Sequence, residues 1–363
     1  MRIVTVLTSL GVGGAEKLAL AVAERMSERG HTVALLVLMA QAPAQWPTKL
    51  PTLYLDIRKE PGSMLAGFRR ARRFLAEFRP EVVHSHSFHA NIFSRLMGLG
   101  MGEAAVLSTI HNVYEGGWPR MMAYRLTDGL SRRSAAVSRA AAERFVRLGA
   151  VPARKCVVVP NGFDLAEFAP SAERRREMRA GMGVSAEFVW LTAGRIAAAK
   201  DYPNLLRAFA RVHKQRGEAQ LWIAGDGEAE PLRRLGAELG IGGAVRWLGL
   251  RRDVAALLDA ADGFVLGSAW EGMPLVLGEA MAMEKPAVAT DVGGVGELAG
   301  KTCELVAAKD PEALAKAMIA TMKKSEEARM RQGCAARARI EERFSLEASV
   351  EAWERLYREI LDE

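Results

Sequence analysis

The stretch Glu271-Gly-Met-Pro-Leu-Val-Leu-Gly-Glu279 places two carboxylates around a predicted helix start. Pro274 suits the first position of a helix, where a missing backbone N–H costs nothing. Glu271 then lies on the loop before the helix, and Glu279 lies about five residues inside it, roughly 7.5 Å along the axis. The two carboxylates therefore flank the start of one helix.

The backbone between these carboxylates forms a candidate anion site. Free N–H groups of Gly272, Met273 and Leu275 point outward at a helix start, which favours bound phosphate. Residues 261–267 read as a buried strand just before it, and open α/β sheets bind ligands on loops that follow strands. A phosphate-rich ligand with hydroxyl-bearing groups on both sides, such as a nucleotide sugar, fits this layout. The alternative is a capped surface helix with two solvated glutamates.

The composition is that of an ordinary globular protein. Half of the 363 residues are hydrophobic and 26% are charged, which suits two domains with packed cores. No apolar run reaches the length of a membrane span, and residues 1–8 predict a strand instead of a signal peptide. Cys156, Cys303 and Cys334 are scattered and lack metal-ligand spacing, so we expect a cytoplasmic protein.

The net charge of +7 is unevenly distributed. Residues 1–170 contain 22 Lys and Arg against 13 Asp and Glu, a balance of +9. Residues 171–363 contain 28 against 30, a balance of −2. The basic first half indicates an anionic partner: a membrane surface, a phosphorylated acceptor or nucleic acid.

Apolar runs alternate with helical patterns along the chain, which predicts parallel sheets with helices on both faces. The predicted strands are residues 2–8, 32–38, 52–56, 82–85, 105–109, 135–137, 156–159, 188–193, 220–224, 244–248, 262–267, 286–290 and 303–306. Helical patterns include residues 15–29, 63–78, 138–148, 201–214, 251–260 and 311–323.

The alternation pauses after Pro160-Asn161-Gly162, and a polar, Arg-rich stretch at 171–179 follows before a new strand starts, so we expect the domain boundary near 165–185. We therefore predict two Rossmann-like α/β domains, residues 1–165 and 166–345, with a cleft between their strand ends.

A glycine-rich turn, Gly11-Val-Gly13-Gly14-Ala-Glu16, follows the first predicted strand. Glycine lets the backbone approach a ligand closely, so Gly13 and Gly14 are candidate ligand contacts. The dinucleotide fingerprint G-x-G-x-x-G is incomplete because Glu16 takes the place of its third glycine, which argues against a dehydrogenase. A tight strand-to-helix turn is the alternative.

Cations and glycines follow strands in the second half as well. Arg195 and Lys200 can neutralise a diphosphate, with the arginine binding its oxygens in a fork. Solvated surface charges are the alternative. Gly225 opens the next turn, and Leu250 follows a further strand whose backbone can face a base.

Four histidines fall near strand ends in the first half. His84, His86 and His89 form His-x-His-x-x-His, and the first two share one strand face. A metal site is disfavoured because no cysteine or nearby carboxylate completes the set, so we expect His86 and His89 to line the cleft. His111 follows another strand and is a further cleft candidate. The sequence contains no Asp-x-Asp pair that could hold a metal against a diphosphate, so no metal cofactor is predicted.

Together, these segments resemble the GT-B glycosyltransferases of family 4. The resemblance covers nearly the whole chain and rests on the first glycine loop, the His111 segment, Pro160-Asn161-Gly162, Gly194-Arg195 with Lys200, Gly225-Asp226-Gly227 and Glu271-x7-Glu279. It implies a GT-B fold with the acceptor domain first and the donor domain second. It also implies that residues 346–363 form a helix that crosses back to the first domain.

The resemblance implies a retaining transferase that takes a sugar from a nucleotide-sugar donor without a bound metal. The sequence does not identify the base or the sugar; we expect a UDP-sugar, with GDP-mannose as the alternative. The acceptor would be a glycan or lipid-linked sugar of surface polysaccharide, lipopolysaccharide or glycolipid assembly. Arg195 and Lys200 match the pair that holds the diphosphate, and Glu279 matches the carboxylate on the ribose hydroxyls. Glu271, with residues 272–275, matches the contacts of the donor sugar.

Three residues of the first half match the same family. Gly13 and Gly14 match a loop near the diphosphate, and His111 matches a position near the donor sugar. The residues expected to act in catalysis are His111, Arg195, Lys200 and Glu271.

Two other functions remain open. A GT-B-like nucleotide-sugar epimerase would need acid–base residues at the sugar. A binding module for nucleotide sugars or nucleic acid would need no catalysis, and because no stacking motif occurs, no nucleic-acid partner is expected.

The segment around residues 63–79 suggests a peripheral contact with the inner face of the membrane. Its apolar residues recur at helical spacing: Met64, Leu65, Phe68, Ala71, Leu75 and Phe78. Five arginines crowd the same segment: Arg69, Arg70, Arg72, Arg73 and Arg79. We expect the stripe to pack on its own sheet and the arginines to face anionic lipid; merely solvated arginines are the alternative.

Overall fold

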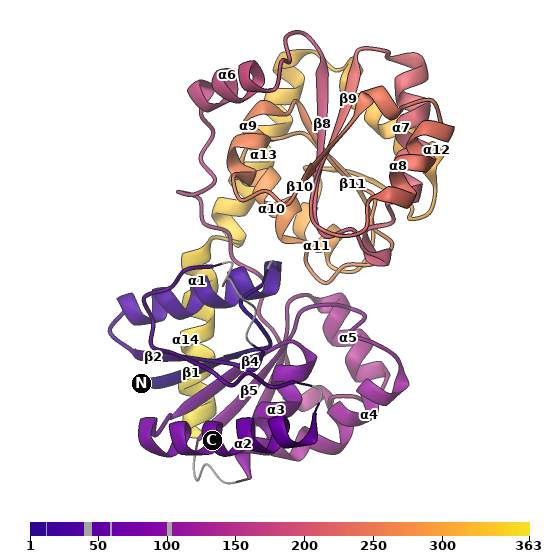
Figure 1. Cartoon of the computed structure of the whole chain (residues 1–363). Helices are drawn as coiled ribbons and strands as arrows, with labels where there is room; N and C mark the ends of the chain where they lie inside the picture. The colour runs from indigo at the N-terminus through magenta and orange to yellow at the C-terminus, as the bar shows by residue number, and fades with distance from the viewer. Residues whose placement is uncertain (12, 40–45, 59, 100–103) are drawn as a thin grey trace. The chain divides into compact units, whose positions relative to one another are not determined.

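The computed structural model describes residues 1–11, 13–39, 46–58, 60–99 and 104–363 (Figure 1). The chain forms two compact units. Unit 1 comprises Met1–Gly162 together with Leu346–Glu363, and unit 2 comprises Phe163–Ser345. The division falls slightly before the predicted boundary at residue 165.

Within the described residues, unit 1 contains a seven-stranded parallel sheet in the order β3-β2-β1-β4-β5-β6-β7. Its strands are β1 (Arg2–Leu7), β2 (Thr32–Val37), β3 (Thr52–Tyr54), β4 (Val82–His86), β5 (Ala105–Ile110), β6 (Arg133–Ala136) and β7 (Cys156–Val158). Its helices are α1 (Gly14–Glu28), α2 (Pro61–Phe78), α3 (Phe88–Gly98), α4 (Trp118–Thr127), α5 (Arg139–Arg147) and α14 (Leu346–Asp362), with 3-10 turns η1 (Asp128–Leu130) and η2 (Ala153–Lys155).

Alternating side chains of these strands pack on both faces of the sheet. Val4 and Val6 of β1 share an apolar cluster with Ala71 of α2. Leu7 points to the other face and packs with Ala19 of α1. Because helices cover both faces, the strands are apolar almost throughout, which is why their positions were predictable from the sequence.

Helix α2 buries a narrower stripe than the sequence predicts. Ala71 is buried, but Met64 and Leu65 are 56% and 52% exposed. Both lie ahead of Gly67, where the helix packs so closely that a Cβ would lie 2.5 Å from Cγ1 of Ile57. The first turn of α2 therefore presents apolar side chains to solvent.

Unit 2, whose residues are all described, contains a six-stranded parallel sheet in the order β10-β9-β8-β11-β12-β13. Its strands are β8 (Phe188–Ala193), β9 (Ala219–Ala224), β10 (Val245–Gly249), β11 (Gly263–Leu266), β12 (Ala287–Thr290) and β13 (Glu304–Val306). Its helices are α6 (Ala172–Gly181), α7 (Tyr202–Gln215), α8 (Glu230–Glu238), α9 (Val254–Ala260), α10 (Leu275–Ala282), α11 (Val295–Ala299), α12 (Pro311–Lys323) and α13 (Glu326–Arg343), with η3 (Ala198–Lys200) and η4 (Gly242–Ala244).

The strand order of each sheet reverses beside its first strand. In unit 2, β9 lies on one side of β8 and β11 lies on the other. The loops that leave β8 and β11 therefore diverge, and such a switch point opens a crevice at the carboxyl ends of the two strands. In unit 1 the corresponding point lies between β1 and β4.

The Arg-rich stretch at 171–179, for which the sequence predicted no helix, lies largely in helix α6 of unit 2. Ion pairs hold it against α9 and the turn before β11: Arg174 Nε lies 2.6 Å from Asp259 Oδ2, and Arg179 Nη1 lies 3.1 Å from Asp262 Oδ2. Because the helix is anchored by arginines and not by an apolar stripe, hydrophobic periodicity did not reveal it.

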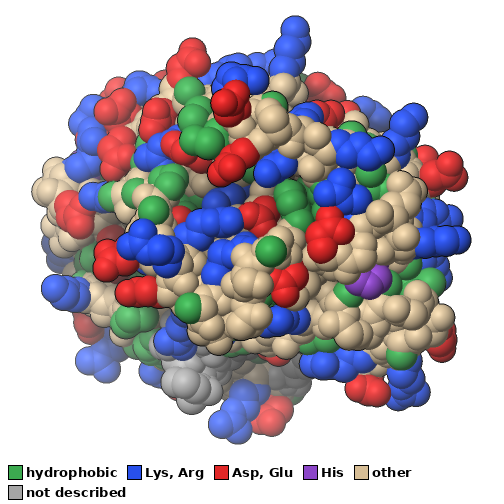
Figure 2. All heavy atoms as spheres, turned by 90° about the horizontal axis from the view of Figure 1, so that it is seen from above, with side chains coloured by type: hydrophobic (Ala, Val, Ile, Leu, Met, Phe, Trp, Pro, Cys, Tyr) green, Lys and Arg blue, Asp and Glu red, His purple; other side chains and the backbone are tan. Residues whose placement is uncertain are grey.

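Over the described residues, no helix combines the length and apolar character needed to cross a membrane. Figure 2 shows one face on which Lys and Arg side chains are interspersed with Asp and Glu.

Candidate functional site

The switch point of unit 2 joins two residues that lie far apart in the sequence. Lys200 ends η3 in the loop after β8, and Glu271 lies in the loop between β11 and α10. Lys200 Nζ donates a hydrogen bond to Glu271 Oε1 over 2.7 Å, with the two side chains only 19% and 9% exposed. Ser268 Oγ donates to the same oxygen over 2.7 Å. A charge-assisted hydrogen bond therefore joins the loop after β8 to the loop after β11 at the switch point.

Two glycines shape the loop that carries Lys200. Gly194 has a φ of +148°, which favours glycine. A Cβ on Gly225 would lie 1.9 Å from the Gly194 carbonyl oxygen, so Gly225 is required for the loops after β8 and β9 to meet. Tyr202 donates its hydroxyl to the same carbonyl over 2.8 Å. Burial, reinforced by the charge of Glu271, raises the pKa of Tyr202, so the hydroxyl stays a donor.

Arg195 and Leu250 lie on the exposed side of these loops. Arg195 is exposed, and no ion-pair partner for it is found among the described residues. Leu250 directly follows β10 and is 40% exposed. Both residues therefore lie at the carboxyl edge of the sheet, where a ligand can reach them.

The start of α10 differs slightly from the sequence prediction. Pro274 has a ψ of 116° and stands just before the helix, which begins at Leu275. An extended backbone at the proline makes it the N-cap residue instead of the first helical one. Gly272 and Met273 are buried beside it, and the Gly272 carbonyl accepts a bond from Gly294 N over 2.8 Å.

Glu271 and Glu279 flank this helix start as predicted, and each is 7% exposed. For Glu271, the bonds from Lys200 and Ser268 offset the cost of this burial. The structure thus brings together Arg195, Lys200, Gly225, Leu250, Glu271, residues 272–275 and Glu279 at one edge of unit 2.

In unit 1, the glycine-rich turn leads directly into α1. Gly13 is the N-cap residue and Gly14 begins the helix. A Cβ on Gly13 would lie 2.0 Å from Glu16 Oε2. Because that atom ends a flexible side chain, which can turn away, this contact alone does not require a glycine at position 13.

Three histidines of unit 1 form a buried row. The His84 and His86 rings, on the same face of β4, are 4.1 Å apart, and His86 Nδ1 lies 3.0 Å from His111 Nε2. Burial lowers the pKa of His84 to about 3 and that of His111 to about 4, and it lowers the pKa of His86 well below its ordinary value. All three rings are therefore neutral at physiological pH.

His89 is not part of this row. It is exposed on α3, and its ring packs against Phe88 at 5.3 Å. His86, in contrast, is only 4% exposed and lies behind His111. Among the described residues, no three His, Cys, Asp or Glu side chains are arranged to hold a metal ion.

Sequence reasoning missed one acidic residue beside His111. The Glu115 carboxylate accepts hydrogen bonds from His111 N over 3.0 Å and from the Tyr124 hydroxyl over 2.7 Å. Burial raises the pKa of Glu115 to about 7. A single glutamate in a loop carries no pattern, so the sequence offered no signal for it; the same holds for Ser268.

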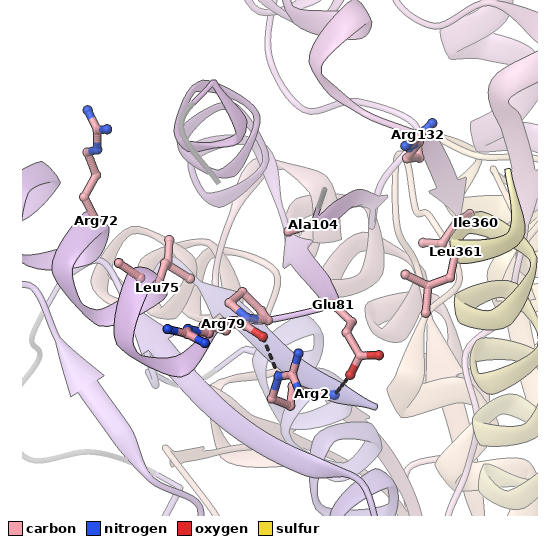
Figure 3. Close-up of a pocket in the computed structure, with 11 residues that line it drawn as sticks. Arg2, Arg72, Leu75, Arg79, Glu81, Ala104, Arg132, Ile360 and Leu361 are labelled. Atoms are coloured by element: carbon pink, nitrogen blue, oxygen red, sulfur yellow. Dashed lines mark hydrogen bonds between the residues drawn. The ribbon is translucent and has the colours of Figure 1, made fainter. Parts of the chain in front are cut away.

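A hollow of about 730 Å³ lies at the opposite, amino-terminal edge of the unit 1 sheet (Figure 3). Four arginines line it: Arg2, Arg72, Arg79 and Arg132. Glu81 Oε2 accepts a bond from Arg2 N over 2.7 Å. The hollow is remote from the carboxyl ends of the strands, where the candidate site lies, and it contributes to the basic character of unit 1.

Two family models match the chain. Residues 187–324 match the model described as Glycosyl transferases group 1. Residues 12–167 match the model described as Glycosyltransferase Family 4. Each match falls largely within one of the two units.

Two curated relatives illustrate the sequence similarity. UDP-Gal:alpha-D-GlcNAc-diphosphoundecaprenol alpha-1,3-galactosyltransferase of Escherichia coli is 26% identical over 68% of this chain. The match spans 66% of that enzyme, so the chain covers just under two thirds of its length. Phosphatidyl-myo-inositol mannosyltransferase of Mycobacterium tuberculosis is 29% identical over 85% of this chain and 84% of its own length.

A solved structure covers the whole fold. The crystal structure of Anabaena Alr3699/HepE in complex with UDP and glucose superposes with a TM-score of 0.86 at 20% identity, over 99% of this chain and 100% of that one. At this identity the likeness concerns the fold alone.

Proposed function

The chain belongs to glycosyltransferase family 4 and has the GT-B fold, and from this premise we propose that it transfers a sugar from a nucleotide-sugar donor to a glycan or lipid-linked acceptor. The donor is a UDP-sugar, the anomeric configuration is retained, and no metal takes part. The reaction serves the assembly of a surface polysaccharide, lipopolysaccharide or glycolipid.

The observation that carries this proposal is the Lys200–Glu271 pair at the switch point of unit 2. Without ligand, each charge neutralises the other in a poorly exposed position. A nucleotide sugar offers a partner to each: its diphosphate attracts the ammonium group of Lys200, and its sugar hydroxyls donate to the carboxylate of Glu271. When the nucleotide sugar binds, the ion pair between Lys200 and Glu271 is therefore replaced by contacts of each side chain with the ligand.

The remaining residues of this edge complete the donor site. Arg195, exposed beside Gly194, binds the diphosphate in a bidentate manner. Glu279 accepts from the ribose hydroxyls, and the backbone at the start of α10 contributes N–H groups to the phosphates.

Departure of UDP needs its developing negative charge to be stabilised. Arg195, Lys200 and the start of α10 provide that stabilisation in place of a metal. The leaving phosphate takes the acceptor's proton during attack on the same face of the sugar, so no enzymic nucleophile is required. For His111 and the turn at Gly13 and Gly14 we keep, as proposals, the roles that the family resemblance implies.

The names of similar proteins support the choice of ligands. The structurally similar Anabaena protein was solved with UDP and glucose. The E. coli relative is named for UDP-Gal and a diphosphoundecaprenol-linked sugar, and the M. tuberculosis relative for phosphatidyl-myo-inositol. A uridine nucleotide and a lipid-linked acceptor are therefore the first ligands to test.

Release of nucleoside diphosphate from a panel of nucleotide sugars, with and without candidate acceptors, tests this function. We expect acceptor-dependent release from a UDP-sugar, lost in Arg195→Ala and kept in Lys214→Ala, which changes an exposed cation of α7. Conversion of the donor to its epimer without acceptor would instead identify an epimerase. Binding of a nucleotide sugar without any turnover would indicate a binding module.

Helix α2 supports a proposed contact with the cytoplasmic face of the membrane. Met64 and Leu65 are exposed at its start, next to exposed Arg69 and Arg72. Arg70 is less available for contact with lipid headgroups, because its guanidinium donates a hydrogen bond to the Tyr54 carbonyl over 2.9 Å. Each free arginine near an anionic surface is worth about 1 kcal/mol.

Co-sedimentation with anionic vesicles tests this contact. The wild-type protein should sediment at low salt and be released as salt screens the charges. Reversal of Arg69, Arg72 and Arg73 to Glu should abolish sedimentation while donor affinity is kept. Equal sedimentation of this triple variant would exclude α2 as the contact.

A further inference from the structure

A chain of buried side chains in unit 1 connects the C-terminal helix with His111. The Tyr357 hydroxyl of α14 lies 2.7 Å from His84 Nδ1, and Thr109 Oγ1 lies 2.6 Å from His84 Nε2. The ring of Trp353, also on α14, lies 4.5 Å from the His84 ring. Because both nitrogens of His84 are bonded, its ring cannot turn without breaking hydrogen bonds.

His86 packs on this fixed ring, with the two centroids 4.1 Å apart. It is 4% exposed, and its Nδ1 lies 3.0 Å from His111 Nε2. Its other nitrogen, Nε2, is buried and has no hydrogen-bond partner among the described residues. His86 therefore has one partner for its two ring nitrogens, and that partner is His111.

This arrangement restricts where the protons lie. A neutral imidazole carries one N–H and one lone pair, so either His86 Nδ1–H donates to His111 Nε2, or His111 Nε2–H donates to His86 Nδ1. The second arrangement leaves a buried N–H on His86 Nε2 without an acceptor. The first leaves only an unpaired lone pair there, which folded proteins tolerate more readily than an unpaired N–H.

We propose that His86 is a positioning residue that donates from Nδ1 to His111 Nε2 and so holds His111 in the tautomer with its proton on Nδ1. In this form His111 presents an N–H donor instead of a lone pair. It can donate a hydrogen bond to a substrate oxygen, but it cannot accept the acceptor's proton. That this oxygen belongs to a sugar rests on the proposed function, whereas the tautomer does not.

The ring nitrogens can be observed directly by NMR. In protein labelled with ¹⁵N at its six histidines, long-range ¹H–¹⁵N spectra distinguish the protonated nitrogen from the unprotonated one, and single His substitutions assign the signals. We expect His111 to be protonated at Nδ1 in the wild type and in His86→Asn, whose amide keeps a donor near this position. In His86→Ala we expect this preference to be lost.

Kinetics separate positioning from mere packing. For histidines that bind a metal, partners that fix the tautomer contribute about 10- to 100-fold to affinity or activity, and we take this as the scale for His111. We therefore expect kcat to fall roughly 10-fold or more in His86→Ala, with little change in the KM of the donor, and to be restored largely in His86→Asn. His213→Ala, near the C-terminal end of α7 in unit 2, is the control and should behave as wild type.

Three results would overturn the proposal: a wild-type His111 protonated at Nε2, an unchanged His111 tautomer in folded His86→Ala, or a kcat that His86→Asn fails to restore. If His86→Ala does not fold, the wild-type and His86→Asn spectra still decide the question. If no nucleotide sugar is turned over, the proposed function fails, but the ring spectra still test the role of His86.

Discussion

The Lys200–Glu271 pair allows two substitutions with opposite expected effects on UDP binding. Lys200→Ala removes a cation from the diphosphate site, and loss of a charge-assisted contact costs about 1.5–3 kcal/mol. This corresponds to roughly 10- to 100-fold weaker binding of UDP. Glu271→Gln keeps the shape of the side chain and its contact with Ser268 but removes the negative charge that holds Lys200.

The size of the second effect follows from the geometry of the pair. Lys200 Nζ lies 2.7 Å from Glu271 Oε1, and the two side chains are 19% and 9% exposed. The ammonium group must therefore leave this carboxylate before it can bind a diphosphate. With the carboxylate neutralised this competition disappears, and we expect UDP to bind about 1–2 kcal/mol more tightly, a factor of roughly 5 to 30. Turnover of the UDP-sugar should nevertheless fall, because Glu271 no longer accepts from the sugar as a carboxylate.

Titration calorimetry with free UDP at constant ionic strength measures both effects. The series comprises the wild type, the two single variants, the double variant and Lys214→Ala as a control for loss of a surface cation. The double variant should resemble Lys200→Ala, because the benefit of neutralising Glu271 requires Lys200. Equal weakening by both single substitutions would show that the pair is a structural unit, and unchanged affinity in both would remove it from the donor site.

Further predictions concern ribose, metal and pH. Glu279→Ala should weaken the binding of free UDP as well as that of the UDP-sugar, by roughly 1.5–3 kcal/mol in calorimetry. Weaker binding of the UDP-sugar alone would show that Glu279 contacts the donor sugar instead of the ribose. Transfer should survive excess chelator, and activity that returns only with added magnesium would refute the charge assignment of Arg195 and Lys200. The raised pKa of Glu115, about 7 against 4.5 unfolded, stabilises unit 1 below pH 4.5, and this contribution is lost as pH rises through 7. Between pH 4.5 and 7 the free energy of unfolding of the wild type should therefore fall by up to roughly 3 kcal/mol because of Glu115, and denaturant unfolding of Glu115→Gln should not show this fall. The same pH dependence in both proteins would contradict the burial of an ionisable carboxyl.

The fold was largely predictable because its strands are buried on both faces. Runs such as β1 and β8 are mostly apolar, and this pattern can be recognised without knowledge of the neighbouring strands. Helix α6 was missed because Arg174 and Arg179 hold it through Asp259 and Asp262. Such partners are distant in sequence and leave no periodic signal in the helix itself.

The sequence named the candidate site residues one by one but not their arrangement. Glycine loops and the Glu271-x7-Glu279 spacing are local features, so the sequence carried them. The bond between Lys200 and Glu271 depends on β8 and β11 being neighbours, which only the strand order provides.

The histidines of unit 1 show the same limit. The two-residue period of a strand predicted that His84 and His86 share a face. Their contacts with Tyr357 and His111 depend on tertiary packing.

The central claim is the transfer of a sugar from a UDP-sugar with retention of its anomeric configuration. A time course of ¹H NMR spectra on the full chain, with a UDP-sugar and a lipid-linked or glycan acceptor, follows the anomeric proton from donor to product. We predict that the α-anomeric signal of the donor is replaced by an α-anomeric signal of the product as UDP accumulates. A product of inverted configuration, or no consumption of any UDP-sugar in the presence of acceptors, would contradict the account.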